Sequence, residues 1–208
     1  MAKVQEIYNK LDKLIPNPQS ELNYSNEFEL IVAVMLSAQC TDKRVNIVTE
    51  KLFKKFKTPE DFANLTQEEL VGYIKSCNYF NNKAKNIINA SKVIVDKFNG
   101  KVPQLHDELV SLPGVGNKTA NVVQAVAFGA QALPVDTHVL RVSNRLGLVK
   151  TNNPDICERE LKKLFKGFDY AKLHHLILLF GRYYCTSRNP KCDECVLKHE
   201  CKLNKNGD

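Results

Sequence analysis

Apolar residues recur at helical spacing along almost the whole chain, and no segment has a pattern typical of a β-strand. Polar start signals precede several of the apolar segments. Thr58-Pro59-Glu60-Asp61 and Asn153-Pro154-Asp155 each combine an N-cap residue, a proline at the first helical position and first-turn acidic residues, and Thr66-Gln67-Glu68-Glu69 is a capping box. The pattern predicts an all-α fold of roughly ten short helices.

Two stretches are more apolar than a one-sided surface helix requires. They are Phe28–Ala38 and, apart from its two histidines, Leu173–Tyr184. We expect both to cross the interior of a domain. We also expect helices to end at Gly100, Gly129 and Gly147, because glycine adopts the left-handed cap conformation without steric cost.

The composition is that of an ordinary globular protein with a basic excess. Of the 208 residues, 43% are hydrophobic and 25% are charged, which argues against long disordered tails. Lys and Arg number 30 against 23 for Asp and Glu, and the sequence pI is about 9.0. This excess favours a polyanionic partner.

The N-terminus, Met1-Ala2-Lys3-Val4-Gln5-Glu6, contains no apolar core that could act as a secretory signal. The longest apolar run, Leu30–Leu36, is far shorter than the roughly 20 residues that span a bilayer. Cys40, Cys77 and Cys157 are scattered within apolar helical patterns, which suits a reducing compartment better than a disulfide framework. We therefore expect a cytoplasmic protein with no membrane role.

A glycine turn separates two helical patterns in the middle of the chain. Leu112-Pro113-Gly114-Val115-Gly116 lies between a short pattern over Gln104–Ser111 and a longer one over Lys118–Phe128. The proline stops the first helix, and the glycines permit a tight turn whose backbone N–H groups face outward at the start of the next helix. Such a turn can bind a phosphate through these N–H groups. By itself, the short pattern favours an ordinary helix connection with a glycine cap.

Four of the seven cysteines crowd the C-terminus: Cys185, Cys192, Cys195 and Cys201. Four thiols this close together, in a chain without an export signal, indicate a metal centre rather than two disulfides. The spacing alone does not decide between a tetrahedral zinc site and a [4Fe–4S] cluster, because both accept four cysteines.

Lys118 falls in the first turn of the helix after the glycine turn, and Asp136 directly precedes the helical pattern Val139–Leu146. The positive end of a helix dipole disfavours an ammonium group in the first turn. A lysine there is usually a solvated surface residue, and an aspartate there is usually a plain N-cap. The functional interpretation of both residues therefore depends on the surrounding motifs.

Those motifs together resemble the endonuclease III family. They are the segment Leu112–Asn121, the sequence Val135-Asp136-Thr137-His138 and the four clustered cysteines, and the resemblance extends from about Asn23, through Leu36-Ser37-Ala38-Gln39, to Cys201. We interpret His138 as structural, or at most as a helper.

The resemblance implies a two-lobed helix-hairpin-helix DNA glycosylase fold with a C-terminal [4Fe–4S] cluster loop. One all-α lobe would comprise residues 23–131 with the hairpin. The second would combine residues 1–22 with residues 132–208 and carry the cluster. No dissociable cofactor is implied, and we expect a monomer.

The implied activity is that of a bifunctional DNA N-glycosylase and AP lyase, which removes an oxidised pyrimidine from duplex DNA and then breaks the strand. The resemblance makes Lys118 the nucleophile that forms a Schiff base and Asp136 its carboxylate partner. One alternative is a monofunctional glycosylase for mismatched bases, which Lys118 argues against. A second alternative is a noncatalytic DNA-binding module with a cluster or zinc, which the joint presence of Lys118 and Asp136 argues against.

The implied partner is double-stranded DNA that contains damaged bases or abasic sites. The hairpin residues Gly114, Val115 and Gly116 would bind phosphates, and so would Arg188 and Lys191 in the cysteine loop, where the cluster has a structural role.

An enzyme that extrudes a nucleotide must fill the gap in the stack. By resemblance, Gln39 fills it from one side and Tyr79 from the other, although a helix-capping turn is the simpler interpretation of Tyr79. The chain departs from the family pattern at three places: Asn78 stands for the usual glycine, Tyr79 for an apolar wedge residue, usually leucine, and Asn117 for the commoner arginine.

Overall fold

The computed structural model describes residues 2–202, and over this range it is all-α, as predicted, with eleven helices and no strand. The chain divides into two compact units. The hairpin unit, Ser20–Ala130, contains α2 (Glu27–Ser37), α3 (Asp42–Lys55), α4 (Pro59–Ala63), α5 (Gln67–Ile74), α6 (Phe80–Phe98), α7 (His106–Val110) and α8 (Asn117–Ala127). The cysteine-loop unit joins Met1–Gln19 to the chain from Gln131 onward and contains α1 (Ala2–Leu14), α9 (Thr137–Arg145), α10 (Pro154–Leu164) and α11 (Tyr170–Tyr183).

The predicted helix starts are confirmed. Thr58 and Thr66 both form complete capping boxes, in which the threonine side chain and the acidic side chain three residues later each accept a backbone N–H. Asn153 caps α10 through the amides of Asp155 and Ile156. Side-chain caps therefore satisfy N–H groups that the first turn of each of these helices leaves without an intrahelical partner.

The glycines at the helix ends adopt left-handed backbone conformations, with φ of 74° at Gly100, 61° at Gly129 and 65° at Gly147. At the end of α6 the prediction was incomplete. Asn99 is the C-cap residue and is itself left-handed, at φ 51°, so two consecutive residues reverse the chain there. Asparagine tolerates this conformation better than other non-glycine residues.

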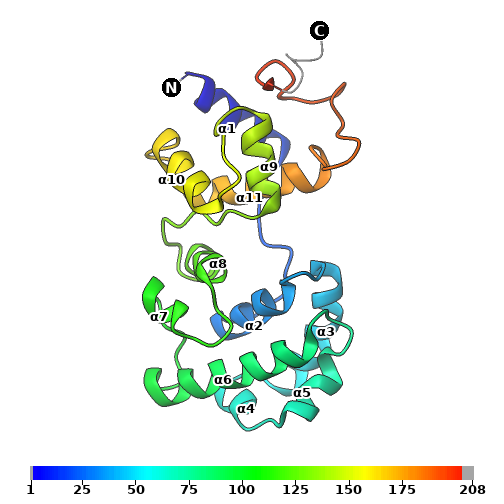
Figure 1. Cartoon of the computed structure of the whole chain (residues 1–208), viewed down its shortest axis with the longest axis vertical. Helices are drawn as coiled ribbons and strands as arrows, with labels where there is room; N and C mark the ends of the chain where they lie inside the picture. The colour runs from blue at the N-terminus through cyan, green and yellow to red at the C-terminus, as the bar shows by residue number, and fades with distance from the viewer. Residues whose placement is uncertain (1, 203–208) are drawn as a thin grey trace. The chain divides into compact units, whose positions relative to one another are not determined.

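The core of the hairpin unit is built around α2. Every side chain of α2 from Phe28 to Leu36 is buried, which confirms the prediction that this stretch crosses a domain interior. Helices α3, α6 and α8 pack against α2, and α4 and α5 lie along α6 (Figure 1).

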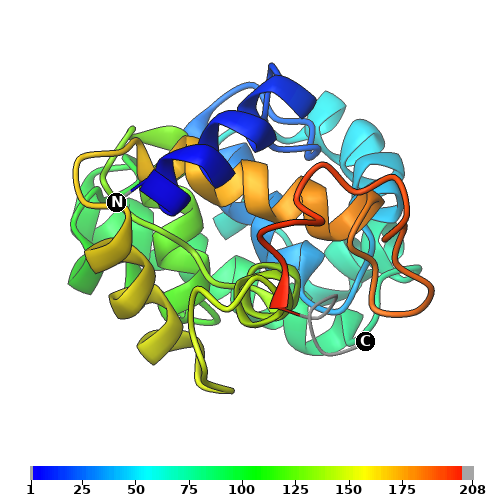
Figure 2. The same ribbon diagram turned by 90° about the horizontal axis from the view of Figure 1, so that it is seen from above.

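The core of the cysteine-loop unit is built around α11, which packs against α1 and α9 (Figure 2). Its histidines, His174 and His175, are buried with the apolar residues. After α11, residues 184–201 form a series of turns. Among the described residues, none of the helices combines the length and the apolar character that a bilayer span requires.

Candidate active site and cluster loop

The surroundings of the two hairpin glycines differ. Gly114 has φ of 78°, and a Cβ there would lie 2.7 Å from the Asn86 Cβ, so the fold itself demands glycine. Gly116 has an ordinary φ of −97°, and a Cβ there would have no atom within 4 Å. The open space at Gly116 is therefore available to a group that approaches the backbone from outside.

The turn uses one of its own amides. The Val115 N–H donates to the Leu112 carbonyl at 3.1 Å, and the Val115 side chain is buried in the core of the hairpin unit. Within the described residues, the N–H groups of Gly114 and Gly116 donate no such hydrogen bond to a backbone carbonyl. The turn is thus anchored from the inside at Val115, and its two glycines present their backbone to the outside.

Lys118 is the second residue of α8, whose N-cap is Gly116. Its side chain is exposed, and its ammonium group forms no hydrogen bond or ion pair with any described part of the chain. The first turn of α8 therefore offers an amine that no internal partner holds.

Gln39 and Tyr79 are both exposed and both have a left-handed backbone, with φ of 54° and 56°. Tyr79 is 64% exposed and is the N-cap residue of α6, without a side-chain cap bond. The Asn78 side chain links the two segments through a 2.6 Å hydrogen bond from Nδ2 to the Gln39 carbonyl. The structure therefore brings together the two residues that the resemblance assigns to the DNA stack.

Asp136 is the N-cap residue of α9 in the cysteine-loop unit, as the simpler interpretation predicted. Its Oδ1 accepts the Val139 N–H at 2.8 Å, and its side chain is partly buried. Oδ2 has no hydrogen-bond partner among the described residues. The cap thus fixes the carboxylate while one of its oxygens stays available.

A buried histidine supports the segment that leads to Asp136. His174 Nδ1 lies 2.8 Å from the Pro134 carbonyl, and this acceptor requires that Nδ1 carries the proton. His174 is 3% exposed. No local sequence pattern signals this contact, because it joins residues 40 positions apart.

Two arginines of α9 hold the start of the cysteine loop. Arg141 donates to the carbonyls of Gly181, at 2.8 Å, and Cys185, at 3.2 Å, and its Nη2 lies 3.2 Å from His138 Nδ1. This contact gives His138 the structural role that we expected. Burial lowers the pKa of Arg141, but guanidinium stays protonated in proteins.

Arg145, one helical turn later, donates to the Thr186 carbonyl at 2.6 Å and the Ser187 carbonyl at 3.1 Å, and its Nη1 lies 3.4 Å from Cys185 Sγ. The Cys201 thiol donates to the Arg145 carbonyl at 3.4 Å. Helix α9 therefore carries Asp136 at its first end and positions the first and last of the four cysteines near its other end. The only sequence signal for this role is the spacing of two arginines four residues apart on one helix face.

The four cysteines suit an iron–sulfur cluster chemically. All four have free thiols and are partly buried. Burial raises the pKa of the Cys195 thiol, and the charges of the other three cysteines raise it further. Among the described residues, no three His, Cys, Asp or Glu side chains are spaced to hold a single metal ion.

The loop is also tied to α1. Glu200, next to Cys201, is 8% exposed, and its Oε1 lies 2.6 Å from Lys10 Nζ. Arg188 and Lys191 are exposed in the same loop, and the Lys191 ammonium lies 5.6 Å from the centre of the Tyr184 ring. The loop thus has an anchored side, and its exposed residues include the basic Arg188 and Lys191 together with the acidic Asp193 and Glu194.

Residues 32–167 match the family described as HhH-GPD superfamily base excision DNA repair protein, and residues 185–201 match the iron–sulfur binding domain of endonuclease III. Endonuclease III of Bacillus subtilis (strain 168) is 47% identical over 97% of this chain and 93% of its own length. The chain belongs to the endonuclease III family. Endonuclease III of Escherichia coli (strain K12) is 41% identical over 100% of this chain and 98% of its own.

Solved structures of endonuclease III have the same fold. A non-covalent endonuclease III–DNA complex has a TM-score of 0.94 at 43% identity and covers 99% of this chain and 96% of its own. A trapped endonuclease III–DNA covalent intermediate has a TM-score of 0.92 at 44% identity, with coverage of 98% and 97%. A thermostable thymine-DNA glycosylase, 22% identical, shares the fold with a TM-score of 0.87.

Membership in this family confirms the predicted two-lobed helix-hairpin-helix glycosylase fold and the enzyme class, a DNA glycosylase and lyase of base excision repair. The match over residues 185–201 identifies the cofactor as a [4Fe–4S] cluster, so the zinc alternative is not supported.

This cofactor gives a prediction for the purified protein. We expect a yellow-brown protein with iron and acid-labile sulfide at about four each per chain. Cys192→Ser should lose the cluster, because three thiolates leave one iron without its ligand. Metal and sulfide analysis with the visible spectrum measures both. Zinc without sulfide in the parent protein would contradict the prediction, whereas Cys157→Ser, in the core of the same unit, should keep the cluster.

Proposed function

We propose that this protein removes oxidised pyrimidines from duplex DNA and then breaks the strand, with Lys118 as nucleophile and Asp136 as its carboxylate partner. The observation that carries the proposal is the position of Lys118, exposed in the first turn of α8 directly after the hairpin. The trapped covalent complex of an endonuclease III with DNA supports a covalent reaction in this family.

In the proposed reaction, the unprotonated Lys118 amine attacks C1′ of the damaged nucleotide. A bond forms between Nζ and C1′, and the glycosidic bond breaks with its electron pair leaving on the base. The C1′–O4′ bond of the sugar ring then breaks as Nζ forms a double bond to C1′, and the two protons that Nζ loses go to the departing base and to O4′, which leaves an imine. Removal of a C2′ proton expels the 3′ phosphate by β-elimination, and water finally hydrolyses the imine and releases Lys118.

Asp136 would stabilise the positive charge that develops on the sugar as the base leaves, and would assist proton removal from the lysine. Its N-cap bond supports this role, because the Val139 amide fixes the carboxylate through Oδ1. His174, bonded to the Pro134 carbonyl, restrains the segment before it.

The proposed DNA contacts divide between the two units. Gly114 and Gly116 would bind a phosphate through backbone N–H groups at the start of α8, where the helix dipole favours an anion. Val115, whose own N–H donates to the Leu112 carbonyl, would hold the turn in place for this contact. The absence of any side chain or neighbour at Gly116 supports this close approach.

In the other unit, Cys185, Cys192, Cys195 and Cys201 would hold the cluster. The bound cluster would tie the loop covalently at four points, and Arg188 and Lys191 on its exposed side would contact phosphates. The hydrogen bonds from Arg141 and Arg145 to the loop carbonyls support a rigid loop.

A strand-nicking assay separates this function from its alternatives. The substrates are a duplex with an oxidised pyrimidine, a matched duplex with a mismatched normal base and an undamaged duplex. We expect nicking of the first alone. Base release without nicking would indicate a monofunctional glycosylase, and binding without either reaction would indicate a noncatalytic module.

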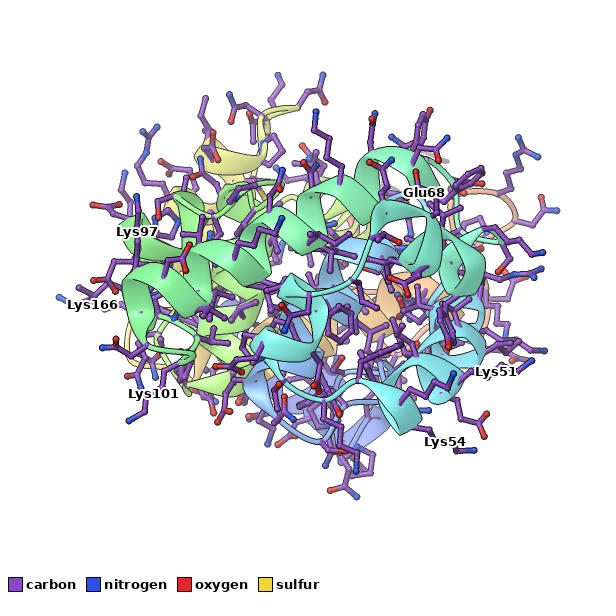
Figure 3. All side chains as sticks on the ribbon, turned by 90° about the horizontal axis from the view of Figure 1, so that it is seen from below. Lys51, Lys54, Glu68, Lys97, Lys101 and Lys166 are labelled. Atoms are coloured by element: carbon purple, nitrogen blue, oxygen red, sulfur yellow. The ribbon has the colours of Figure 1, made fainter. Side chains whose placement is uncertain are left out.

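The basic surface leads to a prediction about salt. Exposed lysines such as Lys51 and Lys54 on α3 and Lys97 on α6 project from the hairpin unit (Figure 3). We expect affinity for undamaged duplex to fall with salt with a log–log slope of roughly −0.9 per phosphate neutralised. Fluorescence anisotropy over a salt series measures the slope, and a flat response would contradict binding through phosphates.

We further propose that the protein works as a monomer in the cytoplasm and is associated with the nucleoid through DNA. The solved complexes of endonuclease III relatives with DNA support the association with DNA.

A further inference from the structure

The two residues proposed to enter the DNA stack have an unusual backbone in common. Gln39 and Tyr79 are two of four non-glycine residues with positive φ in the described chain. A left-handed backbone is unfavourable for residues with a Cβ, and it persists only where the surroundings enforce it. Because both side chains are exposed, the contacts that hold this left-handed conformation must come from the neighbouring segments.

Side chains at and just before the start of α6 hold the chain after α2. Lys83 Nζ donates to the carbonyls of Leu36, at 2.8 Å, and Ala38, at 2.7 Å, and Asn78 Nδ2 donates to the carbonyl of Gln39, at 2.6 Å. Helix ends leave their last carbonyls without intrahelical partners. Here one segment supplies partners for three carbonyls of the other, and the Lys83 cation also suits the negative end of the α2 dipole.

The buried residues next to Gln39 and Tyr79 also pack together. Cys77 is 2% exposed, and burial raises the pKa of its thiol to about 11, with a direct interaction with the Cys40 thiol as a further cause. The Lys83 amide donates to the Tyr79 carbonyl at 3.0 Å. Lys83 and the two cysteines thus connect the buried parts of the two segments, while among the described residues only Asn78 donates a hydrogen bond to the backbone of Gln39 itself.

We propose that Asn78 is a positioning residue that couples Gln39 to Tyr79, so that the two side chains enter the duplex as one unit. The proposal rests on the function proposed above. The Asn78 amide has no competing role as a helix cap, because Tyr79 is the N-cap residue of α6 and no side chain caps that helix. Asn78 is exposed, so its replacement leaves the buried contacts of Lys83 and Cys77 intact.

The first test compares two substrates in single-turnover reactions of the cluster-loaded protein: a duplex with a stacked oxidised pyrimidine, and a duplex with a preformed abasic site. Only the first requires full extrusion of a base. We expect Asn78→Ala to slow base release about threefold to tenfold, the rate equivalent of one net hydrogen bond. Abasic nicking should stay within about twofold of the parent rate, as for a neutral surface substitution.

Two further variants sharpen this comparison. Asn78→Asp keeps the shape but presents an oxygen to the Gln39 carbonyl, so it should slow base release at least as much as Asn78→Ala. Asn82→Ala, exposed in the first turn of α6, is the matched control and should change neither rate by more than about twofold.

The second test is a mutant cycle on the rate of base release. With Asn78 present, the fold loss of the Gln39→Ala, Tyr79→Ala double variant should be smaller than the product of the two single fold losses, because either change alone disables the unit. In the Asn78→Ala background the two losses should multiply, because each side chain then acts independently.

The outcomes separate this role from the proposed function. A parent protein inactive on both substrates would overturn the proposed function and the Asn78 role together. An active parent would overturn the Asn78 role alone if Asn78→Ala slows both reactions equally or neither, or if the Gln39→Ala and Tyr79→Ala losses combine in the same way in both backgrounds.

Discussion

Lys118→Gln should abolish strand nicking, with a loss on the order of 1000-fold or more, because the substitution removes the proposed nucleophile. Glutamine has nearly the same helix propensity as lysine, and the parent side chain is exposed and has no partner in the described chain. Folding, the hairpin and the cluster loop should therefore be unaffected. Damaged duplex should still bind, which separates a loss of chemistry from a loss of recognition.

Borohydride trapping measures the same step directly. An imine between Lys118 and the opened sugar should be reduced to a stable amine that links the protein to the lesion strand, and peptide mapping should place the link at Lys118. Lys92→Gln is a matched control, because it removes another exposed lysine of the hairpin unit. It should trap and nick as the parent does. Efficient trapping that persists in Lys118→Gln and maps to another amine would overturn the assignment.

The sequence predicted most of the features that depend on residues close together in the chain. The caps at Thr58, Thr66 and Asn153 and the buried course of α2 are local, since a capping side chain binds an amide two or three residues away. The helix before the hairpin begins at His106, two residues later than the pattern suggested, because Leu105 is extended and offers no capping side chain. The motifs that signal the family, around the hairpin and in the cysteine loop, are likewise short and contiguous.

The contacts that support the candidate site were not predictable from local patterns. Asn78 and Gln39 are 39 residues apart, and Arg145 and Thr186 are 41 apart. Each contact depends on how helices pack, and no spacing rule connects such positions in one sequence. In the sequence, Asn78 is only a departure from the family pattern, and its hydrogen bond to the Gln39 carbonyl gives that departure a physical meaning.

Asp136→Asn should slow base release on the order of 100-fold, the loss that follows removal of a group placed to stabilise developing charge. The amide keeps the size of the carboxylate but not its charge. Cleavage of a preformed abasic strand should be slowed much less, because the positive charge on the sugar develops mainly while the base departs. Single-turnover rates on a lesion duplex and an abasic duplex measure the two steps separately.

The cap geometry makes this substitution unusually clean. Asp136 Oδ1 accepts the Val139 N–H, and asparagine caps helices as well as aspartate does, so α9 should keep its first turn and its arginines their contacts with the cysteine loop. Asp136→Ser keeps a capping oxygen and also lacks the charge, so its base-release rate should match that of Asp136→Asn. Asp136→Ala loses the cap as well, at about 1 kcal/mol, and its Tm should fall by roughly 2–4 °C below that of the other two variants.

These variants separate the two roles of one side chain. If the carboxylate acts on the sugar, base release follows charge, so all three variants are slow whatever their Tm. If Asp136 matters only as a cap, base release follows stability, so Asp136→Asn and Asp136→Ser keep the parent rate and Asp136→Ala alone is impaired. The second result would remove Asp136 from the chemistry and leave it as the residue that starts α9.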